Sequence, residues 1–330
     1  MRLRHGGLLS RVTVAIPTYA RVQWLGETIA SALGQTFTDL VVEVHDDATP
    51  DDSVERVVAQ FSDPRLKYIR YPENVGIVGN FTRSLLDAST EYVIQLGDDD
   101  VAAPTLVERT VAALDAHPSA GMVHSRFSLI DAAGDVLVAD ENWLGTPSPP
   151  LEAGEQFIER SMLHGSRVCT STALIRRSAV PSDGFRQSDH PPFDFAFWLR
   201  MARSWDIAWV DEVLCAYRVH QRSFTSGLSD VTDHGYMQAE RMMREVHRVK
   251  VEQAEGRRDW VRLADRGMRI EMVYRVRERT LPDRRFVPTF RGLGRAARRE
   301  PSLLREPTAW GLLAGSLVGQ RWVDRLKGRA

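Results

Sequence analysis

The chain has 330 residues, of which 43% are hydrophobic and 26% are charged, with 43 basic against 44 acidic side chains. This composition is typical of a globular protein and excludes a disordered chain, a collagen-like fibre or a mini-protein. Cys169 and Cys215 are the only cysteines. Two cysteines are too few for a disulfide framework or a cysteine-based zinc site, so they indicate a reducing compartment and we expect a cytoplasmic protein.

The amino terminus has basic residues before an apolar stretch, as a signal peptide does. Arg11 interrupts that stretch and no small-residue cleavage site follows, so we expect residues 12–16 to form a first strand instead. No run of about 18 apolar residues is present, so a membrane-spanning helix is not expected.

Charge is distributed unevenly along the chain. Residues 241–330 hold 23 Lys and Arg against 11 Asp and Glu, whereas residues 1–240 hold 20 against 33. We therefore expect one domain over residues 1–228 and a basic, mostly helical region over residues 229–330. Its basic faces, together with the apolar stretch 310–318, suit peripheral contact with the anionic inner face of a membrane. Packing onto the acidic domain and homodimerisation are the alternatives.

Short β-branched runs alternate with helical patterns in the first part of the chain. Strands are predicted at 12–16, 41–44, 66–70 and 92–96, and helices near 24–33, 52–61 and 81–86. This alternation predicts an α/β fold with a parallel sheet and right-handed crossovers. Ligands of such sheets bind at the carboxyl ends of the strands.

The remainder of the chain continues with mixed elements. We predict helices at 106–114, 194–203, 236–255 and 260–279, strands at 122–130, 170–175 and 211–220, and a hairpin turn at 131–134. Residues 140–153 contain three prolines and one glycine and are expected to form a mobile loop or lid.

Three consecutive carboxylates, Asp98, Asp99 and Asp100, follow the strand predicted at 92–96. Their mutual repulsion raises their pKa values unless a cation or hydrogen-bond donors stabilise the charges. Mg²⁺ or Mn²⁺ takes one or two protein carboxylates together with phosphate oxygens and water. This position therefore favours a metal and phosphate site over the alternative, a solvated turn that caps the next helix.

Asp46 and Asp47 stand at the end of the second predicted strand. An acidic residue there can accept a hydrogen bond from a nucleoside, and Asp47 suits the imide N–H of uracil or thymine. Helix capping is the alternative, but Asp51 and Asp52 are already available for that purpose. We therefore favour a nucleotide-binding role for Asp47.

The order of the motifs is more specific than any one of them. In chain order they are VTVAIPTY (12–19), QTF (35–37), HDD (45–47), NVG (74–76), LGDDD (96–100) and WLR (198–200). Over about residues 12–225 this set resembles the family 2 glycosyltransferases of GT-A fold. The resemblance implies a Rossmann-like, mixed but mostly parallel sheet flanked by helices, with a helical extension at the C-terminus. It also implies a nucleotide-diphosphate sugar donor, Mg²⁺ or Mn²⁺, and inversion at the anomeric carbon.

The resemblance also implies roles for single residues in donor binding. Pro17 and Tyr19 would line the nucleotide base and Asp47 would contact it. Asp99 would bind the metal, helped by Asp98 or Asp100, with Asp98 near the ribose and phosphates. Gly97 departs from the family pattern, because many members have the first Asp of a DxD motif at that position.

The general base of the family lies just before a helix, in a frame that FDFAFWLR (193–200) matches. Asp194 takes the base position, and Phe193 replaces the usual first acid. Aromatic neighbours desolvate a carboxylate and raise its pKa, which makes it a better proton acceptor. A plain helix cap at Asp194, or Asp189 as the base, are the alternatives.

Two further segments match the family around the diphosphate. His220 would ligate the metal or contact a phosphate, and Arg218 would neutralise charge on the leaving group. Gly76, Asn80 and Arg83 form a turn into a helix and would contact the donor sugar or phosphate, although helix packing explains them nearly as well.

We therefore expect an inverting glycosyltransferase that moves a sugar from a UDP- or dTDP-sugar to an acceptor hydroxyl. The acceptor can be a glycan, a lipid-linked molecule or a small molecule, and no nucleic-acid partner is expected. A sugar nucleotidyltransferase is one alternative, but the loop from Ile16 to Arg21 lacks the glycines of a phosphate-cradling loop. A nucleotide-sugar binding or scaffold protein without turnover is the other.

Overall fold

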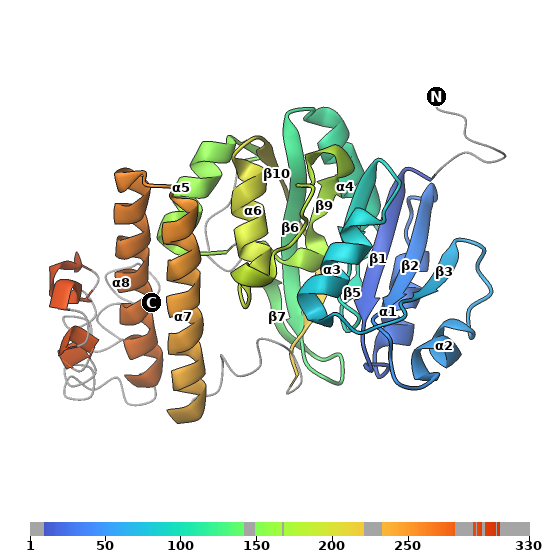
Figure 1. The fold of residues 1–330 in the computed structure, drawn as a ribbon, viewed down its shortest axis with the longest axis horizontal. Coiled ribbons are helices and arrows are strands. Elements are labelled where there is room, and N and C mark those ends of the chain that lie inside the picture. Colours follow the sequence, from blue (N-terminus) through green and yellow to red (C-terminus); the bar gives the residue numbers. More distant parts are fainter. Residues whose placement is uncertain are drawn as a thin grey trace, which may run out of the picture. The chain divides into compact units, whose positions relative to one another are not determined.

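The computed structural model describes residues 10–141, 149–166, 168–220 and 233–280, and short stretches at 293–294, 296–298, 301–307 and 309–310. The chain divides into two compact units. The first comprises Met1–Ser161 and Ser166–Ser226, and the second Met162–Gly165 and Gly227–Ala330. Figure 1 labels the elements in chain order.

The first unit begins with alternating strands and helices. In order these are β1 (Val12–Thr18), α1 (Leu25–Leu33), β2 (Leu40–Asp46), α2 (Ser53–Val58), β3 (Leu66–Arg70), α3 (Gly76–Leu86), β4 (Tyr92–Gln95), β5 (Val101–Ala102) and α4 (Leu106–Ala116). They are followed by β6 (Ala120–Ile130), β7 (Val136–Glu141), β8 (Leu151–Glu152), α5 (Gly154–His164), β9 (Leu174–Arg176), α6 (Phe193–Ala202) and β10 (Asp206–Arg218). Short 3₁₀ helices lie at Thr170–Thr172, Arg177–Ala179 and Gln187–Asp189.

The strands form one mixed sheet in the order β3-β2-β1-β4-β9-β6-β10-β5, with β7 on β6 and β8 on β10. Strands β1, β2, β3 and β4 pair in parallel, whereas β9 runs antiparallel to both β4 and β6. The carboxyl ends of β1, β2 and β4 therefore meet at one edge of the sheet. This architecture confirms the predicted α/β fold with a mixed sheet flanked by helices.

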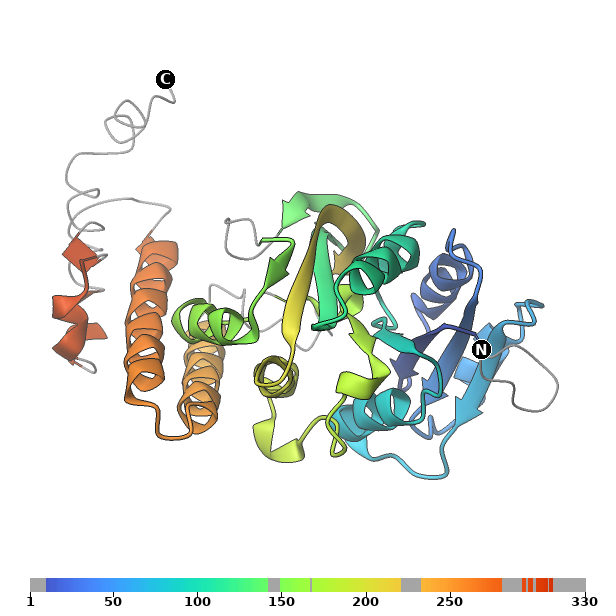
Figure 2. The same cartoon turned by 90° about the horizontal axis from the view of Figure 1, so that it is seen from above.

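Helices cover both faces of the sheet. Figure 2 shows α1 and α4 on one face and α3 on the other. Every residue of β1 and of β2 is buried, including the apolar runs Val12–Ile16 and Leu40–Val44. Strands that are buried on both faces have such nearly continuous apolar sequences. The core thus fixes the two strands whose ends carry Thr18 and Asp46.

Two local predictions are corrected by the structure. The strand predicted at 170–175 is a 3₁₀ turn, Thr170–Thr172, followed by β9. Both the N–H and the hydroxyl of Thr172 donate to the carbonyl oxygen of Cys169, and this local capping competes with strand pairing. Helix α3 begins at Gly76 rather than near Phe81, because the Asp47 carboxylate accepts N–H groups at its first turn.

The second unit contains the long helices α7 (Asp233–Gln253) and α8 (Arg258–Thr280), as predicted, and a 3₁₀ turn at Pro301–Arg305. Its apolar cluster includes Met272, Leu293 and Leu303. The part of the chain that the structure describes contains no helix long and apolar enough to cross a membrane. Of the loop predicted at 140–153, residues 142–148 lie outside the described residues, whereas its ends belong to β7 and β8. Residues 311–318 of the apolar stretch predicted at 310–318 also lie outside the described residues.

Candidate active site

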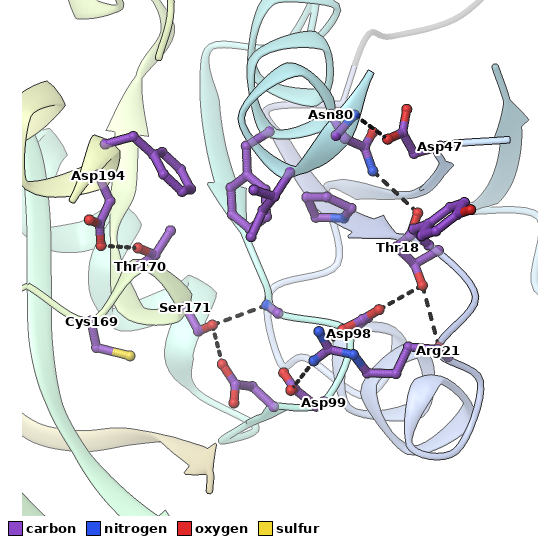
Figure 3. Close-up of a pocket in the computed structure, with 18 of the residues that line it drawn as sticks. Thr18, Arg21, Asp47, Asn80, Asp98, Asp99, Cys169, Thr170, Ser171 and Asp194 are labelled. Atoms are coloured by element: carbon purple, nitrogen blue, oxygen red, sulfur yellow. Dashed lines mark hydrogen bonds and ion pairs between the residues drawn. The ribbon is translucent and has the colours of Figure 1, made fainter. Parts of the chain in front are cut away.

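A cleft of about 540 Å³ opens at the carboxyl ends of β1, β2 and β4 (Figure 3). The first turns of α3 and α6, the acidic turn after β4 and the 3₁₀ turn at Thr170 complete its walls. Its polar lining consists of Thr18, Tyr19, Arg21, Asp47, Asn74, Asn80, Asp98, Asp99, Asp100, Thr170, Ser171, Asp194 and Tyr217. Its other lining residues are Pro17, Gly76, Ile77, Phe81, Gly97, Val168, Cys169, Pro191 and Phe193.

Asp98 is the first carboxylate of the acidic turn and is almost fully buried. The Thr18 hydroxyl donates to Asp98 Oδ2 at 2.6 Å, and Arg21 Nη1 lies 3.2 Å from Asp98 Oδ1. Burial raises the pKa of Asp98 to about 7, and the negative charge of Asp99 adds to this effect while Arg21 opposes it. The carboxylate is therefore held in the cleft by a donor from β1 and by one cation.

Asp99 points its Oδ2 atom toward two nitrogen groups. His220 Nε2 lies 2.8 Å from this oxygen, and Arg21 Nη1 forms an ion pair with it. The imidazole ring of His220 packs against Trp24, with ring centroids 4.2 Å apart. The end of β10 and the loop after β1 thus orient the same carboxylate.

Asp100 is held by the protein itself. Ser171 Oγ donates to Asp100 Oδ2, and the backbone N–H of Arg218 donates to Asp100 Oδ1 at 2.9 Å. Burial, reinforced by the charge of Asp99, raises the pKa of Asp100 to about 8. Asp100 therefore anchors the acidic turn to β10, although it also borders the cleft.

Gly97 explains why this turn departs from the DxD pattern. A Cβ atom at position 97 would lie 2.8 Å from Asp100 Oδ2 and 3.1 Å from Asp99 Oδ1. The Asp100 carboxylate cannot move freely because Ser171 and Arg218 hold it. An aspartate at position 97 would therefore displace the carboxylates of Asp99 and Asp100.

The carboxylates of Asp98 and Asp99 are suitable ligands for a hard divalent cation. Mg²⁺ is usually bound by one or two protein carboxylates, and phosphate oxygens and water supply its other ligands. Among the described residues, no group of three or more His, Cys, Asp or Glu side chains is arranged to hold a metal ion. A metal at Asp99 would therefore complete its coordination with water or with the phosphate oxygens of a bound nucleotide.

Asp47 lines the opposite part of the cleft at the end of β2. Its Oδ2 accepts the Gly76 N–H at 2.9 Å, and its Oδ1 accepts the Val75 N–H at 3.0 Å. Gly76 has a φ of +77°, a conformation that glycine adopts without a steric penalty. Asp47 therefore fixes the turn before α3 against the cleft and also caps that helix.

The side chain of Asn80 joins the ends of β1 and β2. Its Nδ2 donates to the carbonyl oxygens of His45 at 3.1 Å and Thr18 at 3.3 Å. Tyr19, the next residue after Thr18, lines the cleft with 47% of its surface exposed. An exposed aromatic ring beside fixed backbone can stack on a nucleobase.

Asp194 lies across the cleft from Asp47 and Thr18, at the first turn of α6 (Figure 3). Its Oδ1 accepts the Phe195 N–H at 2.7 Å, and Thr170 Oγ1 donates to its Oδ2 at 3.4 Å. Burial raises the pKa of Asp194, partly offset by these two donors. This environment makes Asp194 a stronger proton acceptor than an exposed aspartate.

Three residues predicted at the site do not line the cleft. Arg83 stacks on Tyr71 and lies 3.8 Å from Asp47 Oδ1, behind the cleft wall. Arg218 is 2% exposed, and its guanidinium donates to Glu27 and to the backbone oxygens of Asp99 and Asp131. His220 is not part of the lining and contacts Asp99, which is.

Sequence patterns alone missed several residues that line the cleft, among them Arg21, Thr170 and Ser171. Arg21 could have been found, because it follows Tyr19 in the loop after the first predicted strand. Asp189, the rival to Asp194, is buried in a 3₁₀ turn and does not belong to the lining.

A mixed α/β sheet with an acidic turn at the carboxyl end of a central strand is the arrangement typical of transferases of GT-A fold. A family model described as glycosyl transferase family 2 matches residues 13–180. The chain belongs to this family and is a glycosyltransferase.

Curated relatives of known sequence agree with this assignment. The chain is 25% identical over 216 residues to a chondroitin synthase of Escherichia coli, a match that covers 65% of the chain and 30% of that protein. It is 23% identical over 221 residues to an uncharacterized glycosyltransferase of Haemophilus influenzae, covering 65% of the chain and 67% of that protein. The chain thus spans only about a third of the length of the synthase.

Among solved structures, the chain is similar to residues 1–349 of S. aureus TarS in complex with UDP-GlcNAc. The two share 17% sequence identity with a TM-score of 0.56, over 78% of this chain and 72% of that one. At this identity the likeness supports the GT-A fold and does not carry over the substrate.

Proposed function

We propose that the protein transfers a sugar, with inversion, from a nucleotide-diphosphate sugar to an acceptor hydroxyl. One observation carries this proposal: a single cleft presents Asp47 on one wall, Asp98 and Asp99 in the middle, and Asp194 on the opposite wall (Figure 3). This is the order in which a nucleoside, a diphosphate and a sugar follow one another in such a donor.

A uridine or thymidine nucleotide is the donor that we favour. The Asp47 carboxylate has acceptor capacity for an imide N–H beyond the backbone groups that it already binds, and Tyr19 can stack on a pyrimidine ring. The UDP-GlcNAc complex of the structurally similar TarS is consistent with this choice.

In the proposed reaction, Asp194 accepts the proton of the acceptor hydroxyl while that oxygen attacks the anomeric carbon from the face opposite the diphosphate. The bond from the anomeric carbon to the diphosphate breaks, and the configuration inverts. Asp98 and Asp99 would hold Mg²⁺ or Mn²⁺, which supplies Lewis-acid stabilisation of the negative charge on the leaving group. Thr170 orients the base through its hydroxyl.

The sugar nucleotidyltransferase alternative is less well supported. The turn after β1 has no glycine and presents the side chains of Tyr19 and Arg21 rather than a backbone phosphate cradle. A protein that binds nucleotide sugars without turnover would share the cleft but would not need a carboxylate with a raised pKa at position 194.

A thermal-shift panel of UDP, dTDP, GDP, ADP and CDP, each with and without Mn²⁺ or Mg²⁺, tests the donor class. We expect metal-dependent stabilisation by UDP or dTDP. If no nucleotide raises the melting temperature with either metal, the proposed function is wrong. Donor hydrolysis assays then separate an enzyme from a binding protein, because only the enzyme releases free sugar and nucleotide diphosphate.

For the second unit we propose contact with an anionic lipid surface. Leu304 and Trp310 are half exposed and lie next to each other, since Trp310 Nε1 donates to the Leu304 carbonyl at 2.8 Å. Arg305 lies beside them and is exposed. An exposed aromatic and an exposed aliphatic side chain beside an arginine suit the interface of an anionic membrane.

Co-sedimentation of the full chain with vesicles tests this contact. We expect binding to phosphatidylglycerol-containing vesicles and none to pure phosphatidylcholine. The double variant Leu304→Ser, Trp310→Ser should lose binding, whereas the control Val251→Ser, at another exposed apolar position, should retain it. Equal sedimentation of the wild type with and without vesicles would refute the proposal.

A further inference from the structure

The charges that line the cleft do not suit a diphosphate by themselves. Five described lining residues are carboxylates, namely Asp47, Asp98, Asp99, Asp100 and Asp194. Arg21 is the one Lys, Arg or His among the described lining residues. A nucleoside diphosphate is itself an anion, so its binding requires cations that offset the charge of these carboxylates.

The guanidinium of Arg21 lies against Asp98 and Asp99, where a divalent cation would bind. Its Nη1 atom pairs with Asp99 Oδ2 and lies 3.2 Å from Asp98 Oδ1. The two carboxylate side chains are only 8% and 13% exposed. Because these charges are largely removed from water, their attraction to the guanidinium is stronger than that of a surface ion pair.

The backbone of Arg21 is fixed, whereas its side chain can move. Ala20 has a φ of +51° and donates its N–H to Thr49 Oγ1 at 3.0 Å, which ties the loop to the residues after β2. The Arg21 side chain is 30% exposed and reaches Asp98 and Asp99 only through its terminal nitrogen. A small rotation of the side chain moves that nitrogen without disturbing the loop.

We propose that Arg21 is a displaceable counter-ion that becomes the phosphate-binding arginine of the cleft. Without donor it neutralises Asp98 and Asp99. A divalent cation competes for the same Asp99 oxygen, and the released guanidinium then binds the donor diphosphate, with which it can form paired hydrogen bonds. This inference rests on the proposed function, because it assumes a nucleotide-diphosphate donor.

The proposal predicts effects of opposite sign in one variant. Arg21→Gln removes the cation that pairs with Asp98 and Asp99 and leaves the His220 contact to Asp99 in place, so Mn²⁺ alone should bind several times more tightly than to the wild type. The same variant lacks the phosphate contact, so UDP in the presence of saturating Mn²⁺ should bind about 10-fold more weakly, or worse. Uridine, which has no phosphate, should bind equally to both proteins.

Isothermal titration calorimetry of the full chain measures these affinities, first with MnCl₂ alone and then with UDP, UMP and uridine at saturating Mn²⁺. Arg21→Lys keeps the charge without the paired donors and should give intermediate values. Arg126→Gln is the matched control. Arg126 also forms ion pairs, with Asp140 and Asp211, has a similarly exposed side chain and lies outside the cleft lining.

The outcomes separate this inference from the proposed function. If the wild type binds UDP with Mn²⁺ but Arg21→Gln weakens both the metal and the nucleotide, or changes neither, Arg21 has only a structural role and the inference is wrong. If the wild type binds none of the five nucleoside diphosphates with either metal, the proposed function fails first and the inference fails with it. If Arg21→Gln folds poorly, the affinities of Arg21→Lys for Mn²⁺ and for UDP test the inference instead. Values equal to those of the wild type would then contradict it.

Discussion

His220 Nε2 lies 2.8 Å from Asp99 Oδ2, although the two residues are 121 positions apart in the chain. This contact joins the end of β10 to the acidic turn after β4. Together with Arg21 on the same oxygen, it leaves Asp99 with a defined orientation toward the cleft. The contact depends on the strand order, since β10 reaches the turn through its antiparallel pairing with β5, at Cys215 and Ala102, and through the bonds of Arg218 to Asp99 and Asp100.

The first prediction concerns Asp99. Asp99→Asn should fold but should lose the part of the UDP-induced stabilisation that depends on Mn²⁺, because an amide is a poor ligand for a hard cation. For the wild type at a UDP concentration 100-fold above Kd, this stabilisation is about 2.7 kcal/mol. A thermal-shift assay with and without Mn²⁺ measures the difference.

Asp52→Asn is the control for this experiment, because Asp52 is exposed and pairs only on the surface with Arg56. It should behave as the wild type. A wild-type response to Mn²⁺ and UDP in Asp99→Asn would place the metal elsewhere.

The second prediction concerns the proposed base. Asp194→Asn cannot accept the proton of the acceptor hydroxyl, so kcat should fall by about 10² to 10⁴, while the affinity for UDP with Mn²⁺ stays near that of the wild type. Rates of sugar transfer or donor hydrolysis, compared with calorimetric binding of UDP, measure the two effects separately.

The same substitution should make the protein more stable above neutral pH. Burial raises the pKa of Asp194 in the folded state, so the folded state binds this proton more tightly than the unfolded state does. Stability therefore falls as the pH rises from the unfolded to the folded pKa, and the loss persists at higher pH. Asp194→Asn removes this loss, so its melting temperature at pH 8 should exceed that of the wild type. A lower melting temperature would contradict the assigned burial.

The third prediction uses Thr170 to shift a pH profile. The Thr170 hydroxyl donates to the ionised Asp194 carboxylate and lowers its pKa. Thr170→Val keeps the shape but removes the donor, so the pKa of Asp194 should rise and the acidic limb of the kcat profile should move to higher pH. Steady-state rates between pH 5 and 9 measure this limb. Thr170→Ser retains a hydroxyl and should restore the wild-type limb; an unmoved limb in Thr170→Val would argue against Asp194 as the base.

The sequence predicted the alternation of strands and helices because apolar β-branched runs such as Val12–Ile16 are long and bounded by polar turns. It also predicted that acidic residues after β2 and β4 would meet, since carboxyl ends of parallel strands share an edge. Asp47 and Asp99 line one cleft, as that reasoning required. Asp194, which the family resemblance suggested, lines the same cleft.

Other contacts at the site could not be predicted from sequence because they join distant segments. Ser171 binds Asp100 only because β9 inserts antiparallel beside β4, and no local pattern specifies that pairing. Arg218 was expected at the diphosphate, but its burial and its bond to the Asp99 carbonyl depend on packing against Trp24. A basic residue next to a predicted motif does not reveal whether it faces a ligand or the protein.

The fourth prediction concerns Gly97, whose lack of a side chain permits the acidic turn. In Gly97→Ala the new Cβ would meet Asp100 Oδ2 at 2.8 Å and Asp99 Oδ1 at 3.1 Å. Since Ser171 and Arg218 hold Asp100, the crowding should destabilise the fold by roughly 1 to 3 kcal/mol and weaken UDP binding in the presence of Mn²⁺. Chemical denaturation and calorimetry measure the two effects.

Gly294→Ala is the control, because no atom lies within 4 Å of a Cβ built at position 294. This variant should unfold at the wild-type midpoint. If Gly97→Ala also unfolds at the wild-type midpoint and binds UDP with the wild-type affinity, the acidic turn is not packed as described.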